Sequence, residues 1–208
     1  GDIQASFLPD RAPDIPGWDI AASLVPARQT SGDFYDFFPL EDGRLGVIIA
    51  DVADKGLGAA LYMALGRTLL LTYAQEYPEN PAAVLQATNL RMLSDARAQM
   101  FIPAFYGVLE PDIGRLIYCN AGHHPPLLIR NNVQHDLQRL NPNGMALGID
   151  KDAAWVAISQ RIEVNDSLLL YTDGVVEANN AKDEFYGMQK LIDIAIEVAN
   201  RPSQWVIR

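Results

Sequence analysis

Three aspartates lie at points of this sequence where a strand is expected to end. Asp51 follows the apolar run 45–50, Asp173 follows the apolar run 167–172, and Asp33 lies in the segment SGDFYDFF. A strand that delivers a carboxylate to its end, just before a glycine-containing turn, is a common way to present a metal ligand. Each aspartate alone would be interpreted as a cap or turn residue. The three together indicate a shared site.

Carboxylate oxygens of this kind suit hard divalent cations such as Mg²⁺ and Mn²⁺, which take only one or two carboxylates each. Two ions could therefore share three or four aspartates, with one carboxylate bridging them. Such an ion pair lowers the pKa of a water and holds a phosphoryl group for in-line attack. The sequence offers no convincing nucleophile of its own, because Ser31 and Ser167 have no adjacent histidine and no GxSxG motif is present.

Composition narrows the class of protein. The 208 residues, of which 49% are hydrophobic, are enough for one domain with a sizeable core. The 16 basic against 26 acidic residues give a formal charge of -10, which argues against nucleic acid or an anionic membrane as the main partner. The single cysteine, Cys119, excludes an intramolecular disulfide and a thiolate zinc cluster, and it suits a reducing cytoplasm.

The chain carries no secretory signal pattern, and no apolar run is expected to reach membrane-spanning length. We therefore predict a cytoplasmic segment without membrane insertion. Residues 1–10 have the pattern of the end of a helix. We interpret them as the last part of a connecting helix from an upstream sensory or regulatory domain.

Apolar periodicity predicts the elements that must position the aspartates. Early strands joined by short turns indicate an antiparallel sheet, the middle of the chain is helical, and the second half is mostly strand. This segregation favours an α+β fold over alternating βαβ units. The expected strands are 18–24, 33–40, 44–51, 102–109, 115–120, 127–130, 133–137, 155–162 and 167–172, and the expected helices are 56–76, 81–99 and 187–200.

Five motifs in consistent order resemble the bacterial PP2C-like (PPM) serine/threonine phosphatases. They are SGDFYDFF, LGVIIADVADKGLGAALYMALGRTLL, YCNAGHHPPLLI, GMALGI and LLLYTDGVVEANN followed by EFYG. More narrowly, they are similar to the branch that holds the sporulation stage II and stress-response sigma-factor-regulating phosphatases. The joint pattern, from about Ile3 to Gly187, is much more specific than any one motif.

The resemblance implies an αββα sandwich, in which two antiparallel sheets are flanked by helices, over residues 11–208. It implies two Mn²⁺ or Mg²⁺ ions in the channel between the sheets. It further implies hydrolysis of phosphoserine or phosphothreonine on a partner protein by an ion-activated water, in bacterial signalling to an anti-sigma-factor antagonist. Relatives usually end with a further aspartate pair and a final strand, so we expect the domain to lack its C-terminal segment here.

The roles of individual residues carry over from the matching motifs. Asp33 matches the first metal-site aspartate, and Asp51 matches the aspartate that bridges the two ions. Val52 would contribute its backbone carbonyl, because its side chain cannot bind metal. Asp173 matches the later aspartate, beside which Gly174 either leaves room or serves as an ordinary turn glycine.

Other polar residues near these motifs have two interpretations each. Asp36 and Glu177 are candidates for contacts behind the ligands or are solvated surface carboxylates. Lys55 would steer phosphate or simply be exposed in its turn. His123 and His124 invite a catalytic role, but in a proline-bounded turn we interpret them as structural.

Competing functions remain open from the sequence. The expected absence of the usual C-terminal ligand leaves a non-catalytic docking domain or pseudophosphatase as the alternative to an enzyme. Reading TDGVVEA as an aspartyl-phosphate hydrolase motif conflicts with the antiparallel signals. A homodimer is an open alternative to the monomer, and we predict that an upstream domain or a dimer partner regulates activity through the helix at 56–73.

Overall fold

The computed structural model describes residues 8–9, 11–25, 32–53, 56–95, 100–131 and 136–207. The connecting helix expected over residues 1–10 falls almost entirely outside these ranges. That boundary stays a prediction.

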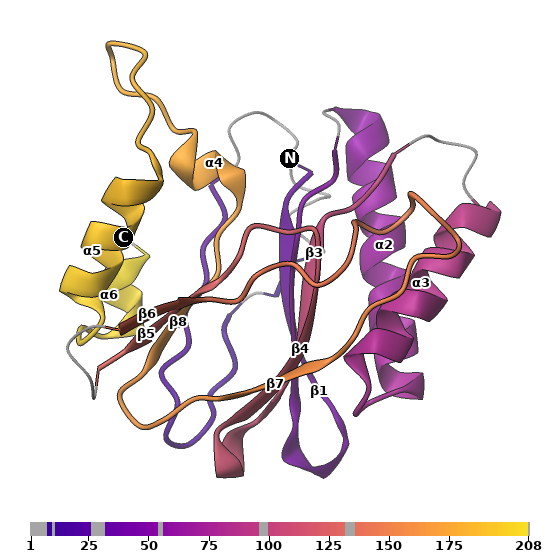
Figure 1. Cartoon of the computed structure of the whole chain (residues 1–208), viewed down its shortest axis with the longest axis horizontal. Helices are drawn as coiled ribbons and strands as arrows, with labels where there is room; N and C mark the ends of the chain where they lie inside the picture. Colours follow the sequence, from indigo (N-terminus) through magenta and orange to yellow (C-terminus); the bar gives the residue numbers. More distant parts are fainter. Residues whose placement is uncertain are drawn as a thin grey trace.

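Two antiparallel sheets lie face to face at the centre of the molecule (Figure 1). The larger sheet has the strand order β1-β2-β3-β4-β7, and the smaller one has the order β6-β5-β8. Strands of the larger sheet are β1 (Phe34–Pro39), β2 (Leu45–Ala50), β3 (Ala104–Glu110), β4 (Arg115–Ala121) and β7 (Ile158–Arg161). Strands of the smaller sheet are β5 (Leu127–Arg130), β6 (Asp136–Arg139) and β8 (Ser167–Leu169).

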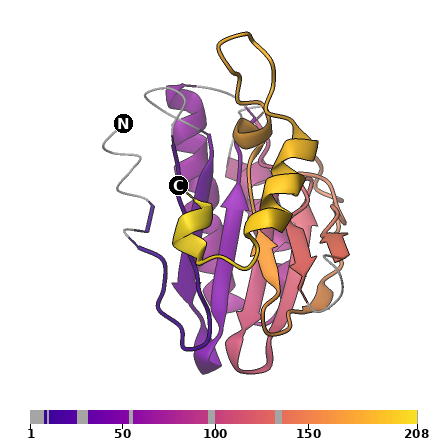
Figure 2. The same cartoon turned by 90° about the vertical axis from the view of Figure 1, so that its left-hand side faces the viewer.

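Helices cover both outer faces of this pair of sheets. The long helices α2 (Leu57–Glu76) and α3 (Pro81–Asp95) lie against the larger sheet, and α5 (Met188–Val198) lies on the side of the smaller sheet (Figures 1 and 2). Two helices of one turn complete the set, α4 (Asp173–Val176) and α6 (Ser203–Val206). The α+β class predicted from the order of elements is confirmed, and so is the sandwich of two antiparallel sheets that the resemblance implies.

Alternation along the strands divides the buried side chains into three cores, one for each gap between layers. On β1, Phe34 and Phe38 point to the helix side and pack with α2 and α3, whereas Phe37 packs into the layer between the sheets. On β5, Leu128 faces that same middle layer, and its neighbour Leu127 packs with α5. Odd-numbered and even-numbered residues of one strand therefore enter different layers. We call this the parity of a residue: on β1 and β2 the odd-numbered side chains face the layer between the sheets.

Two tight turns set the hairpins of the larger sheet. The β1–β2 turn is a single 3₁₀ turn, η1 (Glu41–Gly43), in which Asp42 and Gly43 have φ of 55° and 72°. A second such turn, η2 (Pro111–Ile113), joins β3 to β4 and ends on Gly114, with φ of 63°. Left-handed residues of this kind reverse the chain within a few positions. Both turns lie where the sequence predicts them.

The strand expected at 18–24 is wrong. Within residues 11–25 the structure has only an isolated bridge between Ile15 and Trp18. Trp18 and Ile20 flank the polar Asp19 as alternating strand residues would, because both pack against the middle layer, but among the described residues no adjacent strand pairs with this segment. One-sided burial explains the pattern without a ladder.

No apolar run was expected to reach membrane-spanning length, and helix α2 departs from that expectation. By length and composition it is the one helix, among the described residues, that could cross a membrane. A core helix of a water-soluble domain passes the same test, and α2 packs Tyr62, Met63 and Leu70 into the core against the larger sheet. Leu57 and Leu61, in its first turns, are 73% and 65% exposed.

Candidate metal centre

Strand pairing brings Asp33 and Asp51 opposite each other. Phe34 pairs with Ala50 at the end of the β1–β2 ladder, and the Val52 amide donates a hydrogen bond to the Gly32 carbonyl oxygen at 3.3 Å. This bond continues the antiparallel register by two residues, so that the two aspartates face each other across the strands. Opposed residues have Cβ atoms about 4.5–5.5 Å apart, a distance at which like charges repel. A cation between them would remove that repulsion.

By the alternation of β1 and β2, both aspartates belong to the face of the larger sheet that borders the layer between the sheets. They share the parity of Phe37, Leu45 and Val47, which pack into that layer. Val52 has the opposite parity, and its side chain is buried in the helix-side core. For Val52, only the backbone can face the carboxylates.

Asp173 approaches from the second sheet. It follows β8 by four residues and opens α4, and its neighbour Thr172 donates a hydroxyl hydrogen bond to Asp33 Oδ2 at 2.7 Å. The partners are 139 residues apart in sequence, so this bond reports how the sheets are packed. The first and third predicted ligands thus lie at the same end of the middle layer.

Gly32 sits where a side chain would collide with the predicted ligands. A Cβ on this residue would lie 2.7 Å from the Val52 carbonyl oxygen and 3.1 Å from Asp51 Oδ1. These two oxygens therefore converge on one backbone position. At Gly174 a Cβ would lie 3.9 Å from Asp33 Oδ2, an ordinary contact distance, so space for the site does not require glycine there.

The donor set fits a hard divalent cation in the type of its atoms. All four predicted groups offer oxygen, and they come from both sheets to one end of the middle layer. Among the described residues, however, no three side chains of the Asp, Glu, His or Cys type are grouped closely enough to hold a metal ion as they stand. The assignment of Asp33, Asp51, Val52 and Asp173 as ligands stays a prediction.

His123 occupies the same end of the larger sheet. It is 2% exposed, and burial lowers the pKa of its ring to about 4 even though Asp33 and Asp173 act in the opposite direction. Both carboxylates are thus close enough to influence the imidazole. His124 is oriented differently, with its ring 5.8 Å from that of Tyr171.

Three further polar residues near the motifs were candidates for the site: Asp36, Glu177 and Lys55. Asp36 lies on the opposite face of β1 from Asp33 and forms an ion pair with Arg67 of α2 at 2.6 Å. Burial raises the pKa of Asp36, and Arg67 opposes the rise. Glu177 is exposed just after α4, and Lys55 lies outside the described residues. Asp36 therefore links the sheet to a helix, and it does not face the predicted ligands.

Sequence reasoning missed Gly32 and Thr172, and it gave His123 only a structural role. The Thr172–Asp33 contact depends on how the sheets pack, which local patterns do not encode. Gly32 could have been found, because register places it opposite Val52 once the hairpin is assigned. The signal available in the sequence was a glycine directly before Asp33 and a threonine directly before Asp173.

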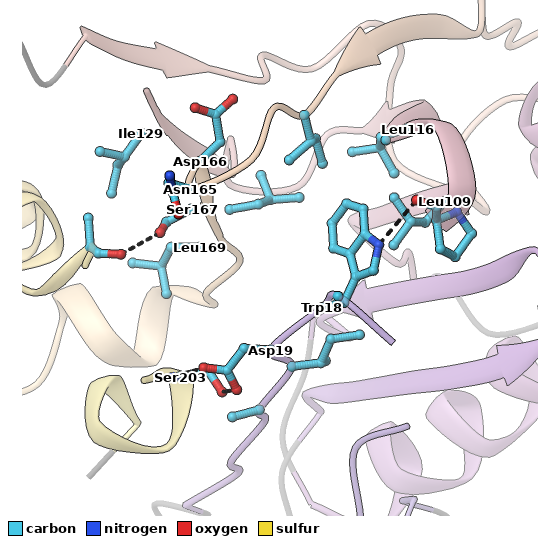
Figure 3. Close-up of a pocket in the computed structure, with 18 of the residues that line it drawn as sticks. Trp18, Asp19, Leu109, Leu116, Ile129, Asn165, Asp166, Ser167, Leu169 and Ser203 are labelled. Carbon is cyan, nitrogen blue, oxygen red and sulfur yellow. Dashed lines mark hydrogen bonds between the residues drawn. The ribbon is translucent and has the colours of Figure 1, made fainter. Parts of the chain in front are cut away.

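A cavity lies at the other end of the middle layer, where β2 begins. Figure 3 shows its lining. Its volume is about 920 Å³, and Trp18, Leu109, Leu116, Ile129 and Leu169 contribute to its lining. Leu45, the first residue of β2, lines it, whereas Asp51 follows the last residue of that strand. The predicted metal ligands take no part in this cavity.

The fold defines the class of protein. The SiaA-PP2C domain of Pseudomonas aeruginosa superposes with a TM-score of 0.74 at 20% sequence identity, covering 85% of this chain and 70% of that one. The architecture is that of a PP2C-type phosphatase domain.

Sequence comparison then defines the family. Protein IcfG of Synechocystis is 35% identical over 218 residues, which cover 92% of this chain and 34% of IcfG. The phosphoserine phosphatase RsbU of Bacillus subtilis is 34% identical over 200 residues, covering 92% of this chain and 57% of RsbU. The family described as Stage II sporulation protein E (SpoIIE) matches residues 41–208, and the chain belongs to it. The resemblance inferred from the motifs is confirmed.

Proposed function

We propose that this chain is a metal-dependent protein phosphatase domain that hydrolyses phosphoserine or phosphothreonine on a partner protein. The observation that carries the proposal is the register that sets Asp33 opposite Asp51, with Thr172 bonded to Asp33 from the other sheet. Membership of the SpoIIE family and the similarity to the phosphoserine phosphatase RsbU support it. Because the chain matches only 34% and 57% of these relatives, the activity is inferred for this domain alone.

Each predicted ligand has a part in the proposal. Asp33, Asp51 and Asp173 would hold the Mn²⁺ or Mg²⁺ ions through their carboxylates, and Val52 would contribute its backbone carbonyl. When bound, the ions supply an ionised water near neutral pH and neutralise charge on the phosphate. The Thr172 hydroxyl fixes the orientation of the Asp33 carboxylate by donating to Oδ2.

The proposed substrate is a phosphorylated anti-sigma-factor antagonist, and the proposed regulator is an upstream sensory domain. Helix α2 begins at Leu57, six residues after Asp51, so a displacement of α2 would be transmitted to that ligand over a short stretch of backbone. The net charge of -10 repels the phosphate group of a phosphoprotein unless cations occupy the site. Activity should therefore depend strictly on added divalent metal.

A docking domain without catalysis is the alternative. One observation favours this alternative. Among the described residues, no three Asp, Glu, His or Cys side chains are grouped closely enough to hold a metal ion. On this alternative, Mn²⁺ would bind weakly or not at all, and phosphoserine release would stay at background. Isothermal titration with Mn²⁺ separates the two functions before any substrate is known.

The decisive experiment compares Asp51→Asn with Asp112→Asn. Asp112 is an exposed residue of the η2 turn, away from the predicted ligands, so its substitution makes the same chemical change without touching them. Release of phosphate from a phosphoserine peptide in Mn²⁺ should fall by about 100-fold or more in Asp51→Asn, because a predicted ligand carboxylate is lost. It should be unchanged in Asp112→Asn. An active Asp51→Asn protein would overturn the proposed mechanism.

A further inference from the structure

His123 lies two residues after the end of β4, at the carboxylate end of the larger sheet. Ala50 of β2 pairs with Ala104 of β3, and Ala104 also forms a bridge with Gly122. Asp51 and His123 each come one residue later. The imidazole therefore starts from the same end of the sheet as the predicted ligands.

Hydrogen bonds hold the ring in a defined orientation and tautomer. The backbone amide of His123 donates to Asn120 Oδ1 at 2.8 Å, and Asn120, fully buried, donates through Nδ2 to the Leu140 carbonyl at 3.0 Å. Nδ1 of His123 lies 2.9 Å from the His124 carbonyl oxygen. A carbonyl only accepts, so Nδ1 carries the proton and Nε2 presents a lone pair.

Nε2 is the unexplained atom of this arrangement. It is buried, and no hydrogen-bond partner for it lies among the described residues. Buried polar atoms without a partner are rare, and in native proteins they often mark an ordered water or a functional group. Both polar atoms of the Asn120 side chain have partners within the fold, whereas the ring acceptor of His123 has none among the described residues.

We propose that His123 is a positioning residue, whose Nε2 accepts a hydrogen bond from a water held among Asp33, Asp51 and Asp173. The pattern of one ring nitrogen bonded to a backbone carbonyl, with the other facing the site, is the usual way to orient a histidine at a metal centre. Because the Nδ1 proton is donated to the His124 carbonyl oxygen, the lone pair of Nε2 is available to accept. This inference rests on the proposed function, since the water is the one expected to attack phosphate.

Two substitutions separate this role from a purely structural one. The amide of His123→Asn sits near the Nδ1 position and can still donate to the His124 carbonyl, but it cannot replace Nε2. The longer side chain of His123→Gln brings an amide oxygen near the Nε2 position, while it gives up the Nδ1 bond. A positioning role predicts that kcat falls by about 10–100-fold in the Asn variant and by less than about 5-fold in the Gln variant, with KM changed little in both.

The opposite ranking, with Asn active and Gln impaired, would show that only the bond to His124 matters and would overturn the inference. Wild-type rates in both variants would overturn it equally. Thermal melting of each variant checks that a loss of rate is not a loss of fold. If both variants fail to fold, the wild-type protein decides the matter by NMR.

The NMR measurement follows the ¹⁵N resonances of the His123 ring during titration with Mg²⁺, with the resonances of the three histidines assigned from His124→Gln and His135→Gln. We expect a protonated Nδ1 throughout and an Nε2 resonance that shifts as Mg²⁺ is added. An Nε2 resonance that does not respond would reject the positioning role. The response does not require turnover, so it remains readable even if the phosphatase proposal fails because the wild-type protein releases no phosphate.

Discussion

The two ends of the layer between the sheets are built differently. At the carboxylate end, backbone register and a hydrogen bond between the sheets place polar groups against one another, as the Val52–Gly32 and Thr172–Asp33 bonds show. At the cavity end, mostly apolar side chains surround about 920 Å³. There the polar ties come from irregular segments, such as the Asp19–Ser203 bonds and the Trp18–Pro111 bond (Figure 3).

This difference indicates which parts of a β-sandwich can hold functional side chains in a precise geometry. Residues at the end of a ladder inherit their position from paired backbone, which fixes side-chain direction through the alternation of faces. Segments outside a ladder lack that constraint. We therefore expect substitutions at the carboxylate end to change metal affinity and turnover, and substitutions at the cavity end to change stability alone.

Gly32→Ala should produce the largest effect. Its Cβ would lie 2.7 Å from the Val52 carbonyl oxygen and 3.1 Å from Asp51 Oδ1, so the hairpin end must open to admit it. We expect at least about a 100-fold loss of Mn²⁺-dependent phosphate release, together with about 1–3 kcal/mol lost from the free energy of unfolding. Steady-state kinetics and urea unfolding measure the two quantities.

Gly17→Ala is the matched control at the cavity end. Gly17 lines the cavity with open space around it and has φ of 82°, so a Cβ meets strain in the backbone but no neighbour. About 1 kcal/mol of stability should be lost, with the Mn²⁺ affinity unchanged. Equal losses of affinity in the two alanine variants would contradict the division between the ends.

Arg67→Ala should have the next largest effect, on stability. The substitution leaves the Asp36 carboxylate, 3% exposed, without its ion-pair partner. Breaking a buried pair typically costs about 3–5 kcal/mol, and the cost here should be about 2–3 kcal/mol because Arg67 is itself partly exposed. Metal affinity should change little, since Asp36 and Asp33 lie on opposite faces of β1.

The cost of Arg67→Ala should depend on pH in a defined direction. Burial already raises the pKa of Asp36, and without Arg67 the pKa in the folded state rises further above the unfolded value of 3.8. The variant is therefore penalised most above this raised pKa, and the penalty shrinks as pH falls through it towards 3.8. Unfolding free energies of variant and wild type at pH 7 and pH 5 test this, and a gap that widens on acidification would refute it. In an Asp36→Asn background the pH dependence of the gap should disappear.

The sequence was sufficient for those parts of the site that depend on local pattern. Asp51 ends an apolar run and Asp33 opens a paired strand, so their shared end of the sheet followed once the β1–β2 hairpin was assigned. Thr172 could not be placed in this way, because its contact with Asp33 depends on the packing of one sheet against the other. The partner of Asp36 lies on a helix 31 residues later, and no spacing rule links a strand carboxylate to such a residue.

The fold, like the site, was predicted correctly where local sequence pattern determines it and incorrectly where pairing with distant residues determines it. Element types, the hairpin turns and the α+β class followed from periodicity. The strand expected at 18–24 was wrong, because alternation records which side is buried and does not record whether a neighbouring strand is present. That segment, with Trp18, instead forms part of the cavity lining.

Trp18→Phe gives the smallest expected effect and the strictest test of the comparison. The indole Nε1 of Trp18 donates to the Pro111 carbonyl oxygen at 3.2 Å, tying the irregular segment to the turn between β3 and β4. Phenylalanine keeps an aromatic ring in the lining but loses this bond, so about 1 kcal/mol of stability should be lost while kcat and Mn²⁺ affinity stay the same. Trp205→Phe, at a side chain 68% exposed, makes the same change outside the cavity lining and should shift stability by less than about 0.5 kcal/mol. If kcat fell several-fold in Trp18→Phe alone, the apolar end would be coupled to the carboxylates through the middle layer, and the separation of roles argued from strand register would have to be abandoned.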